Sequence, residues 1–199
     1  MQKILSLGAK RESAELGSDD PVKWRVIRSD SPQETALLFT PCGPLDSSFL
    51  YLLKKTDHTW RVVDDVGFDC HYDNSVSFEV ASLRNPNVDD VLVHHECEEH
   101  GTGLVKQNFN VFAIVSSRFK LVLSTEEIVK ESGWPGGGEV DQQSVFAAMP
   151  TTGTGSGIIG ETRNIKDNGT LTVEKRYFRW SQMRFRFVPS KFVKVKHQG

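Results

Sequence analysis

Short apolar runs, separated by polar turn residues, recur along the chain after its first 20 positions. They are rich in Val, Ile, Leu, Phe and Trp, a composition that favours β-strands. In one of them Leu171 and Val173 share a face while Thr172 and Glu174 share the other, the alternation of a half-buried strand. The pattern predicts an all-β fold of about twelve strands, at 23–29, 35–41, 48–55, 59–65, 75–83, 89–96, 108–116, 118–124, 144–149, 157–165, 171–180 and 184–195.

Four stretches begin with an aromatic residue, followed by a base and two apolar residues, at 24–27, 60–63, 119–122 and 185–188. The last three follow another strand-like run across a short polar turn, at 55–58, 116–117 and 181–182. We therefore predict three hairpins whose return strand begins with an aromatic side chain in the core. Asn168 and Gly169 predict a further tight hairpin, because Asn-Gly supplies the positive φ angles of a type I′ turn.

The strands preceding each hairpin extend the pattern to antiparallel four-stranded meanders repeated about three times. Such repetition suggests a propeller-like or multi-sheet assembly, with a sandwich or an open barrel as the second choice. Three units are few for a closed propeller, so a homo-oligomer completed by a partner chain is one expectation. We expect a polar N-terminal arm at 1–20 and a single β-rich domain at 21–197. Residues 124–127 resemble a helix capping box, with extended chain as the alternative.

Composition narrows the classes of partner. The chain has 199 residues, 38% of them hydrophobic, and a formal net charge of -2, which provides no general attraction to nucleic acid or to anionic membranes. No run approaches the roughly 18 apolar residues that cross a bilayer, so we expect no membrane span and no nucleic acid partner. The N-terminal apolar stretch is too short and broken for a signal peptide. The protein is then cytoplasmic, or periplasmic or extracellular if a signal peptide was removed.

One segment resembles a known repeat. Asp90 begins an Asp-apolar-apolar-apolar strand, and Asn85, Asn87 and Asp89 lie in the loop before it. This arrangement resembles the FG-GAP/VCBS-type β-propeller repeats of bacteria, which place a calcium loop before such a strand. The loop here is shorter and lacks the central Asp-Gly of the family. The resemblance implies a propeller-like extracellular or periplasmic binding module.

The densest group of metal-binding residue types lies near the end of the sixth predicted strand. Zinc accepts His and Cys ligands, and the candidate metal ligands are His94, His95, Cys97 and His100, joined by Cys70 and His71. Against a shared ion, consecutive residues of a strand point to opposite faces, so His94 and His95 do not both reach one metal easily. The alternative is an ordinary polar strand end. We expect no cofactor, with zinc or calcium as the alternative.

Other possible sites have simpler explanations. The three cysteines are interpreted as free and buried, with a bridge between Cys70 and Cys97 as the alternative. The text Gly-x-Gly-x-x-Gly at 155–160 precedes a strand pattern and not a helix, so a loop is preferred to a dinucleotide site. Bases alternate with aromatics at 175–187, as expected of a half-buried hairpin.

These observations predict a non-catalytic binding or structural module, of the bacterial cell envelope, with a protein or carbohydrate partner. The basis is the repeat pattern together with the lack of a catalytic motif. The alternative is a metal-binding protein or metal-dependent enzyme that uses the His/Cys cluster at 94–100.

Overall fold

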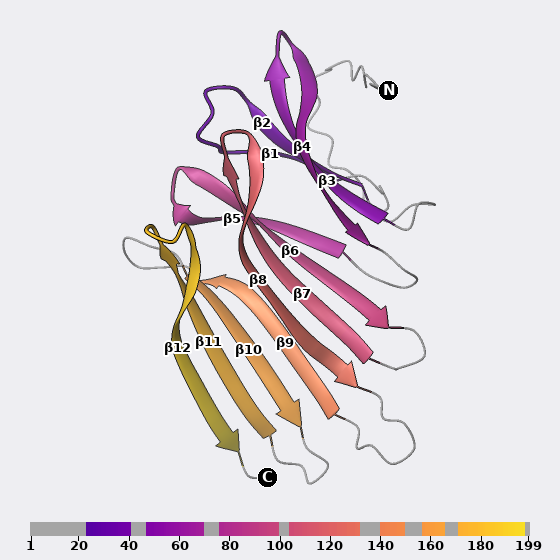
Figure 1. Ribbon diagram of the computed structural model, residues 1–199, viewed down its shortest axis with the longest axis vertical. Helices are drawn as coiled ribbons and strands as arrows, with labels where there is room; N and C mark the ends of the chain where they lie inside the picture. Colours follow the sequence, from indigo (N-terminus) through magenta and orange to yellow (C-terminus); the bar gives the residue numbers. More distant parts are fainter. Residues whose placement is uncertain are drawn as a thin grey trace.

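The computed structural model describes residues 23–40, 47–69, 76–99, 104–131, 140–149, 157–165 and 171–197. These residues form twelve β-strands (Figure 1). Within these ranges no helix is long and apolar enough to cross a membrane. The all-β prediction is confirmed.

Three antiparallel meanders follow one another along the chain (Figure 1). The first unit consists of β1 (Lys23–Ile27), β2 (Thr35–Thr40), β3 (Ser47–Thr56) and β4 (Thr59–Asp69). The second unit consists of β5 (Val76–Asn85), β6 (Val88–Glu99), β7 (Leu104–Val115) and β8 (Arg118–Glu131). The third unit consists of β9 (Val140–Met149), β10 (Gly157–Ile165), β11 (Leu171–Ser181) and β12 (Arg186–His197). The predicted grouping of the strands into three fours is therefore confirmed.

The second and third units are not separate sheets. At one end of β8, Lys130 pairs with Asp141 and Glu131 pairs with Val140 of β9, so β5 to β12 form one eight-stranded sheet. Strand β12 nevertheless contacts β8, four strands away in the sheet order. Because a flat sheet would hold these strands far apart, the sheet folds over and its two halves face each other. Strand β4 of the first unit contacts β8 in turn.

Two hydrophobic cores fill the spaces between consecutive units. The first core joins the first and second units, and the second core joins the second and third. Neighbouring residues of β6 alternate between them: Val91 and Val93 pack in the first core and Leu92 packs in the second. The middle unit is thus buried on both faces, which explains the continuous apolar runs at 91–93 in β6 and at 111–115 in β7.

The three units repeat in detail as well as in outline. The last strand of each unit carries a β-bulge at its fifth residue, at Val63 in β4, Val122 in β8 and Ser190 in β12. Such a bulge inserts one unpaired residue and increases the local twist. Since the irregularity recurs at one position, it provides a structural register by which residues of different units can be matched.

That register corrects one reading of the sequence. The β7–β8 hairpin has the predicted two-residue turn at 116–117, and the β3–β4 turn is limited to 57–58, shorter than the predicted 55–58; φ is positive at both turn residues of each. The β11–β12 hairpin has a longer turn at 182–185, and Phe185 lies in it with a φ of 47°. The second residue of the return strand is therefore Phe187, which corresponds to Trp60 and Phe119. The aromatic–base pattern at 185–188 is offset by two residues from its structural counterpart.

Element boundaries differ from prediction at a few places. Residues 124–127 belong to β8, so the helix alternative is wrong and the extended alternative is correct. Strand β9 begins at Val140, before the predicted start at 144. The N-terminal arm at 1–20 and the turn at Asn168 and Gly169 lie outside the described residues.

Candidate functional site

An arginine–aspartate latch joins the first unit to the second. Arg28, directly after β1, donates from its backbone N to Oδ2 of Asp89 at 2.8 Å and from Nη2 to Oδ1 at 2.7 Å. The same guanidinium donates to Ser82 Oγ at 2.6 Å, and Asp89 N donates back to the Arg28 carbonyl at 2.9 Å. Burial alone would raise the pKa of Asp89, but the hydrogen bonds from Arg28 and Ser82 and the charge of Arg28 outweigh it and leave the pKa lowered.

The next residue connects the second unit to the third. Asp90 is fully buried, and its Oδ1 accepts from Arg84 Nε at 2.5 Å. The Arg84 guanidinium lies over the rings of Trp180 and Phe185, at 5.5 and 5.9 Å from their centroids. Burial raises the pKa of Asp90, and the charge of Arg84 opposes that shift only in part. Two consecutive aspartates therefore serve two different neighbours.

These aspartates belong to the segment that resembles a calcium loop. Asn87 N donates to Asn85 Oδ1 at 2.9 Å, which closes the turn between β5 and β6. The carboxylates of Asp89 and Asp90, in contrast, accept hydrogen bonds from arginines. Among the described residues, no group of three or more His, Cys, Asp and Glu side chains could hold a metal ion. The described oxygens of this loop thus build contacts between strands and units.

The two described histidines of the candidate metal cluster point to opposite faces of β6. His95 is buried toward the first unit, with its ring 5.9 Å from that of Phe68. His94 lies on the other face, 4.8 Å from the ring of Phe109 and 3.7 Å from Oε1 of Glu79. Burial lowers the pKa of His94, and the charge of Glu79 opposes that shift. A single ion therefore cannot take both histidines as ligands.

The remaining candidate ligands are not placed by the structure. Cys97 pairs with Lys106 in the β6–β7 ladder, and its side chain lies outside the description. Cys70, His71 and His100 lie outside the described residues altogether. The bridge between Cys70 and Cys97, and a zinc site built from these residues, remain predictions.

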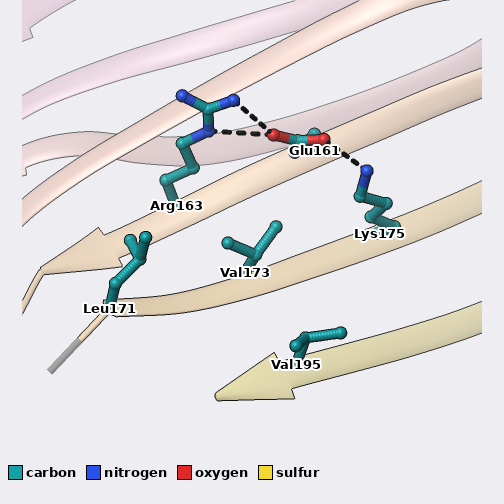
Figure 2. Close-up of a pocket in the computed structure, with 6 residues that line it drawn as sticks. All are labelled: Glu161, Arg163, Leu171, Val173, Lys175 and Val195. Carbon is teal, nitrogen blue, oxygen red and sulfur yellow. Dashed lines mark hydrogen bonds and ion pairs between the residues drawn. The ribbon is translucent and has the colours of Figure 1, made fainter. Parts of the chain in front are cut away.

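The outward face of the third unit carries a shallow hollow of about 540 Å³ (Figure 2). An ion network crosses it, in which Glu161 Oε1 accepts from Arg163 Nη2 at 2.8 Å and Glu161 Oε2 accepts from Lys175 Nζ at 2.9 Å. Hydrogen bonds from Lys175 and Arg163 lower the pKa of Glu161. The rest of the lining is apolar and consists of Leu171, Val173 and Val195.

The outward face of the first unit is rich in aromatic rings. Trp24 and Trp60 meet edge to face, with centroids 4.9 Å apart, and Phe49 stacks on Tyr51 at 5.8 Å. These four side chains share a face. Trp24 pairs with Leu38, which pairs with Tyr51 on β3. Trp60 pairs with Lys55, and positions 49, 51 and 55 lie on the same side of β3 because side chains alternate along a strand. None of them belongs to either of the two cores. Val62, on this face, is 50% exposed.

Sequence reasoning missed the residues that join the units. The latch of Arg28 and Asp89 connects positions 61 residues apart, so no local pattern announces it. One signal was present: two adjacent aspartates at the start of an apolar strand must face opposite sides, and both are costly to bury without a partner. Arginines just after one strand and near the end of another, at 28 and 84, were the available partners.

No family model, no curated protein and no solved structure matches the chain.

Proposed function

We propose that the protein is a non-catalytic interaction module, in which three stacked units, arranged like propeller blades, hold two end faces ready for a partner. The observation that carries this proposal is the use made of the carboxylates. Asp64, Asp89 and Asp90 each accept hydrogen bonds that join strands or units. They thus support the stack.

A catalytic carboxylate must leave an oxygen free to meet its substrate. Both oxygens of Asp89 accept hydrogen bonds, from Arg28 and Ser82, and both oxygens of Asp90 accept from Arg84, one of them from its backbone amide. Glu161 likewise gives one oxygen to Arg163 and the other to Lys175. In each of these carboxylates the protein itself balances the charge and supplies hydrogen-bond donors to both oxygens.

The end faces support the interaction part of the proposal. Trp and Tyr are over-represented at the centres of protein interfaces, because they bury much area at a small cost in conformational entropy. The face of the first unit combines Trp24, Tyr51 and Trp60 with the half-exposed Val62. The opposite end of the stack presents the hollow, in which apolar side chains such as Val173 lie beside the Glu161 ion network.

Thermal unfolding of carboxylate variants tests whether these groups are structural. Replacing a functional residue commonly raises stability, because active sites hold strained or poorly paired groups, whereas replacing a structural one lowers it. We expect Asp89→Asn and Glu161→Gln both to lower the melting temperature, because hydrogen bonds and charges of the fold lower the pKa of each carboxylate. The exposed Asp30→Asn serves as the control and should leave it unchanged. A rise in melting temperature on replacing Asp89 would contradict the proposal and point to a reactive site.

Metal analysis of the purified protein addresses the alternative function. Stoichiometric zinc that is lost on replacing His95 and Cys97 together by alanine would replace the present proposal with a metal-dependent one. The opposite orientations of His94 and His95 give that alternative no support. A bacterial, extracellular or periplasmic setting follows from the repeat resemblance and stays a prediction.

A further inference from the structure

Each junction between units is formed by one face of the earlier unit and one face of the later unit. The two end faces of the stack are equivalent to these two kinds of face. Phe112 and Phe178 hold the same position relative to the bulge, and each packs in the core shared with the preceding unit. Leu53 holds that position in the first unit, on the face that bears Tyr51 and Trp60. The aromatic end face is therefore the side with which a unit packs onto its predecessor.

The same register identifies the opposite end. Asp64 and Leu123 directly follow their bulges, and each faces the unit that comes next: Asp64 accepts from Phe119 N at 2.6 Å, and Leu123 shares a core with Phe187. Lys191 directly follows the third bulge. It lies on the outward face of the third unit, with its Nζ 5.8 Å from the centroid of the Tyr177 ring.

We propose that a second copy of this chain completes the stack, with the Lys191 face of one copy against the Trp60 face of the other. The proposal rests on the interaction module proposed above and names its partner. Asp64 contacts Phe119 at the first junction, and Leu123 shares a core with Phe187 at the second. The next pair in this series is Lys191 with Trp60. An ammonium group over an indole ring is itself attractive.

The contact is head to tail, because it joins two different faces. Such contacts close into a ring when the rotation between successive units divides the circle, and otherwise continue as an open chain. Two copies closing on each other use both end faces of each copy, which yields a ring of six units. The aromatic patch and the apolar hollow are then buried together, which removes exposed apolar surface from water.

Disulfide trapping tests the pairing directly on the full chain. Lys191→Cys and Trp60→Cys are introduced in separate chains, and the two chains are mixed under oxidising conditions. We expect a covalent dimer from the mixture and none from either variant alone. The wild-type chain run in parallel reports links through the three native cysteines. A covalent dimer formed by Trp60→Cys alone would show like faces meeting and would overturn the proposal.

Light scattering provides a test that does not depend on changing Trp60. We expect the wild type to be a dimer at micromolar concentration, and Lys191→Glu to weaken the dimer at least tenfold. Arg61→Glu is the matched control, because Arg61 is an exposed base on the other face of the first hairpin, and it should leave the dimer unchanged. A monodisperse wild-type monomer overturns the second-copy proposal and leaves the non-catalytic one standing, since the carboxylate variants test that separately.

Discussion

The backbone amide of Phe119 donates a hydrogen bond of 2.6 Å to Oδ2 of Asp64, across 55 residues of chain. Asp64 is the residue after the β4 bulge, and Phe119 is the second residue of β8. The bulge thus turns an acceptor toward the neighbouring unit at the point where that unit begins its last strand. This contact joins the return strands of the first two units, which also contact each other through other residues.

Removing that acceptor should weaken the junction between the first two units. We expect Asp64→Ala to lower the free energy of unfolding by about 1–3 kcal/mol, because the Phe119 amide loses its partner in a partly buried position. Asp64→Asn keeps an acceptor oxygen and should cost less. Chemical denaturation measures both, and Asp65→Ala, an exposed neighbour, is the control. Equal losses at 64 and 65 would show that the contact contributes nothing.

Asp89 and Asp90 should shape the pH dependence of stability in opposite directions. The folded pKa of Asp89 is lowered, so its stabilising contribution is present above the unfolded pKa, about 3.9, and is lost as the pH falls through the folded value. The folded pKa of Asp90 is raised, so its contribution is greatest below the unfolded pKa and is lost as the pH rises through the folded value.

Denaturation of the variants between pH 2 and 7 separates these contributions. Asp89→Asn should reduce the loss of unfolding free energy that occurs as the pH falls below the unfolded pKa. Asp90→Asn should remove the loss of unfolding free energy that occurs as the pH rises through the folded pKa of Asp90. Identical pH profiles for the two variants would contradict the structure. The thermodynamic slope reports bound protons directly, so the comparison does not depend on the absolute loss of stability in either variant.

The β7–β8 turn contains two residues whose replacement should stabilise the protein. Ser116 and Ser117 have φ angles of 50° and 65°, in the left-handed region that costs an ordinary residue roughly 1–2 kcal/mol. The double change Ser116→Asn and Ser117→Gly should therefore gain about 1 kcal/mol, because Asn-Gly favours this turn type. Calorimetry should show a melting temperature about 2–4 °C higher. Ser77→Gly, at an exposed position within strand β5, should instead lower it.

The core between the second and third units should not tolerate a side chain at Gly160. A Cβ there would overlap Cε1 of Phe146 and lie 2.8 Å from its Cδ1. Phe146 cannot move away, because its other face stacks on Phe109 with centroids 4.7 Å apart. We expect Gly160→Ala to cost about 1–3 kcal/mol in urea denaturation. Adding Phe146→Leu should recover part of that loss, and a Gly160→Ala protein of unchanged stability would refute the packing.

The structural register also ranks two aromatic residues that look alike in the sequence. Phe187 corresponds to Trp60 and Phe119 and is 3% exposed, so Phe187→Ala should cost about 3–5 kcal/mol. Phe185 lies in the turn at a positive φ, where its ring contacts Trp180, Arg84 and Lys120. Phe185→Ala should cost less. A larger loss at 185 than at 187 would restore the alignment suggested by the sequence pattern.

The strands and their grouping could be predicted because both depend on local information. The alternation at 171–174 and the turn at Ser116 and Ser117 are each encoded by neighbouring residues. The pairing of β8 with β9 could not be predicted, since it joins positions such as 130 and 141 across a Gly-rich segment. The latch between Arg28 and Asp89 was missed for the same reason, because these residues meet only after two units have formed.

The candidate site shows the same division. Opposite orientations for His94 and His95 follow from strand geometry alone, and the structure confirms them. The two end faces could not be predicted, because the sequence does not show which face of each strand is buried in which core. The core position predicted for the aromatic residue at 60 is wrong, because its face, which also bears Trp24, lies at the end of the stack and outside both cores.

Consecutive aspartates that serve opposite neighbours have an evolutionary consequence. A one-residue insertion or deletion upstream in β6 would exchange Asp89 and Asp90, turning each away from its own arginine at the same time. Val91, Val93 and Leu92 would change sides with them. Insertions and deletions in natural relatives should therefore be absent from β6 and concentrated in the connections between strands. Sequences that share this architecture can then be aligned on β6 without gaps.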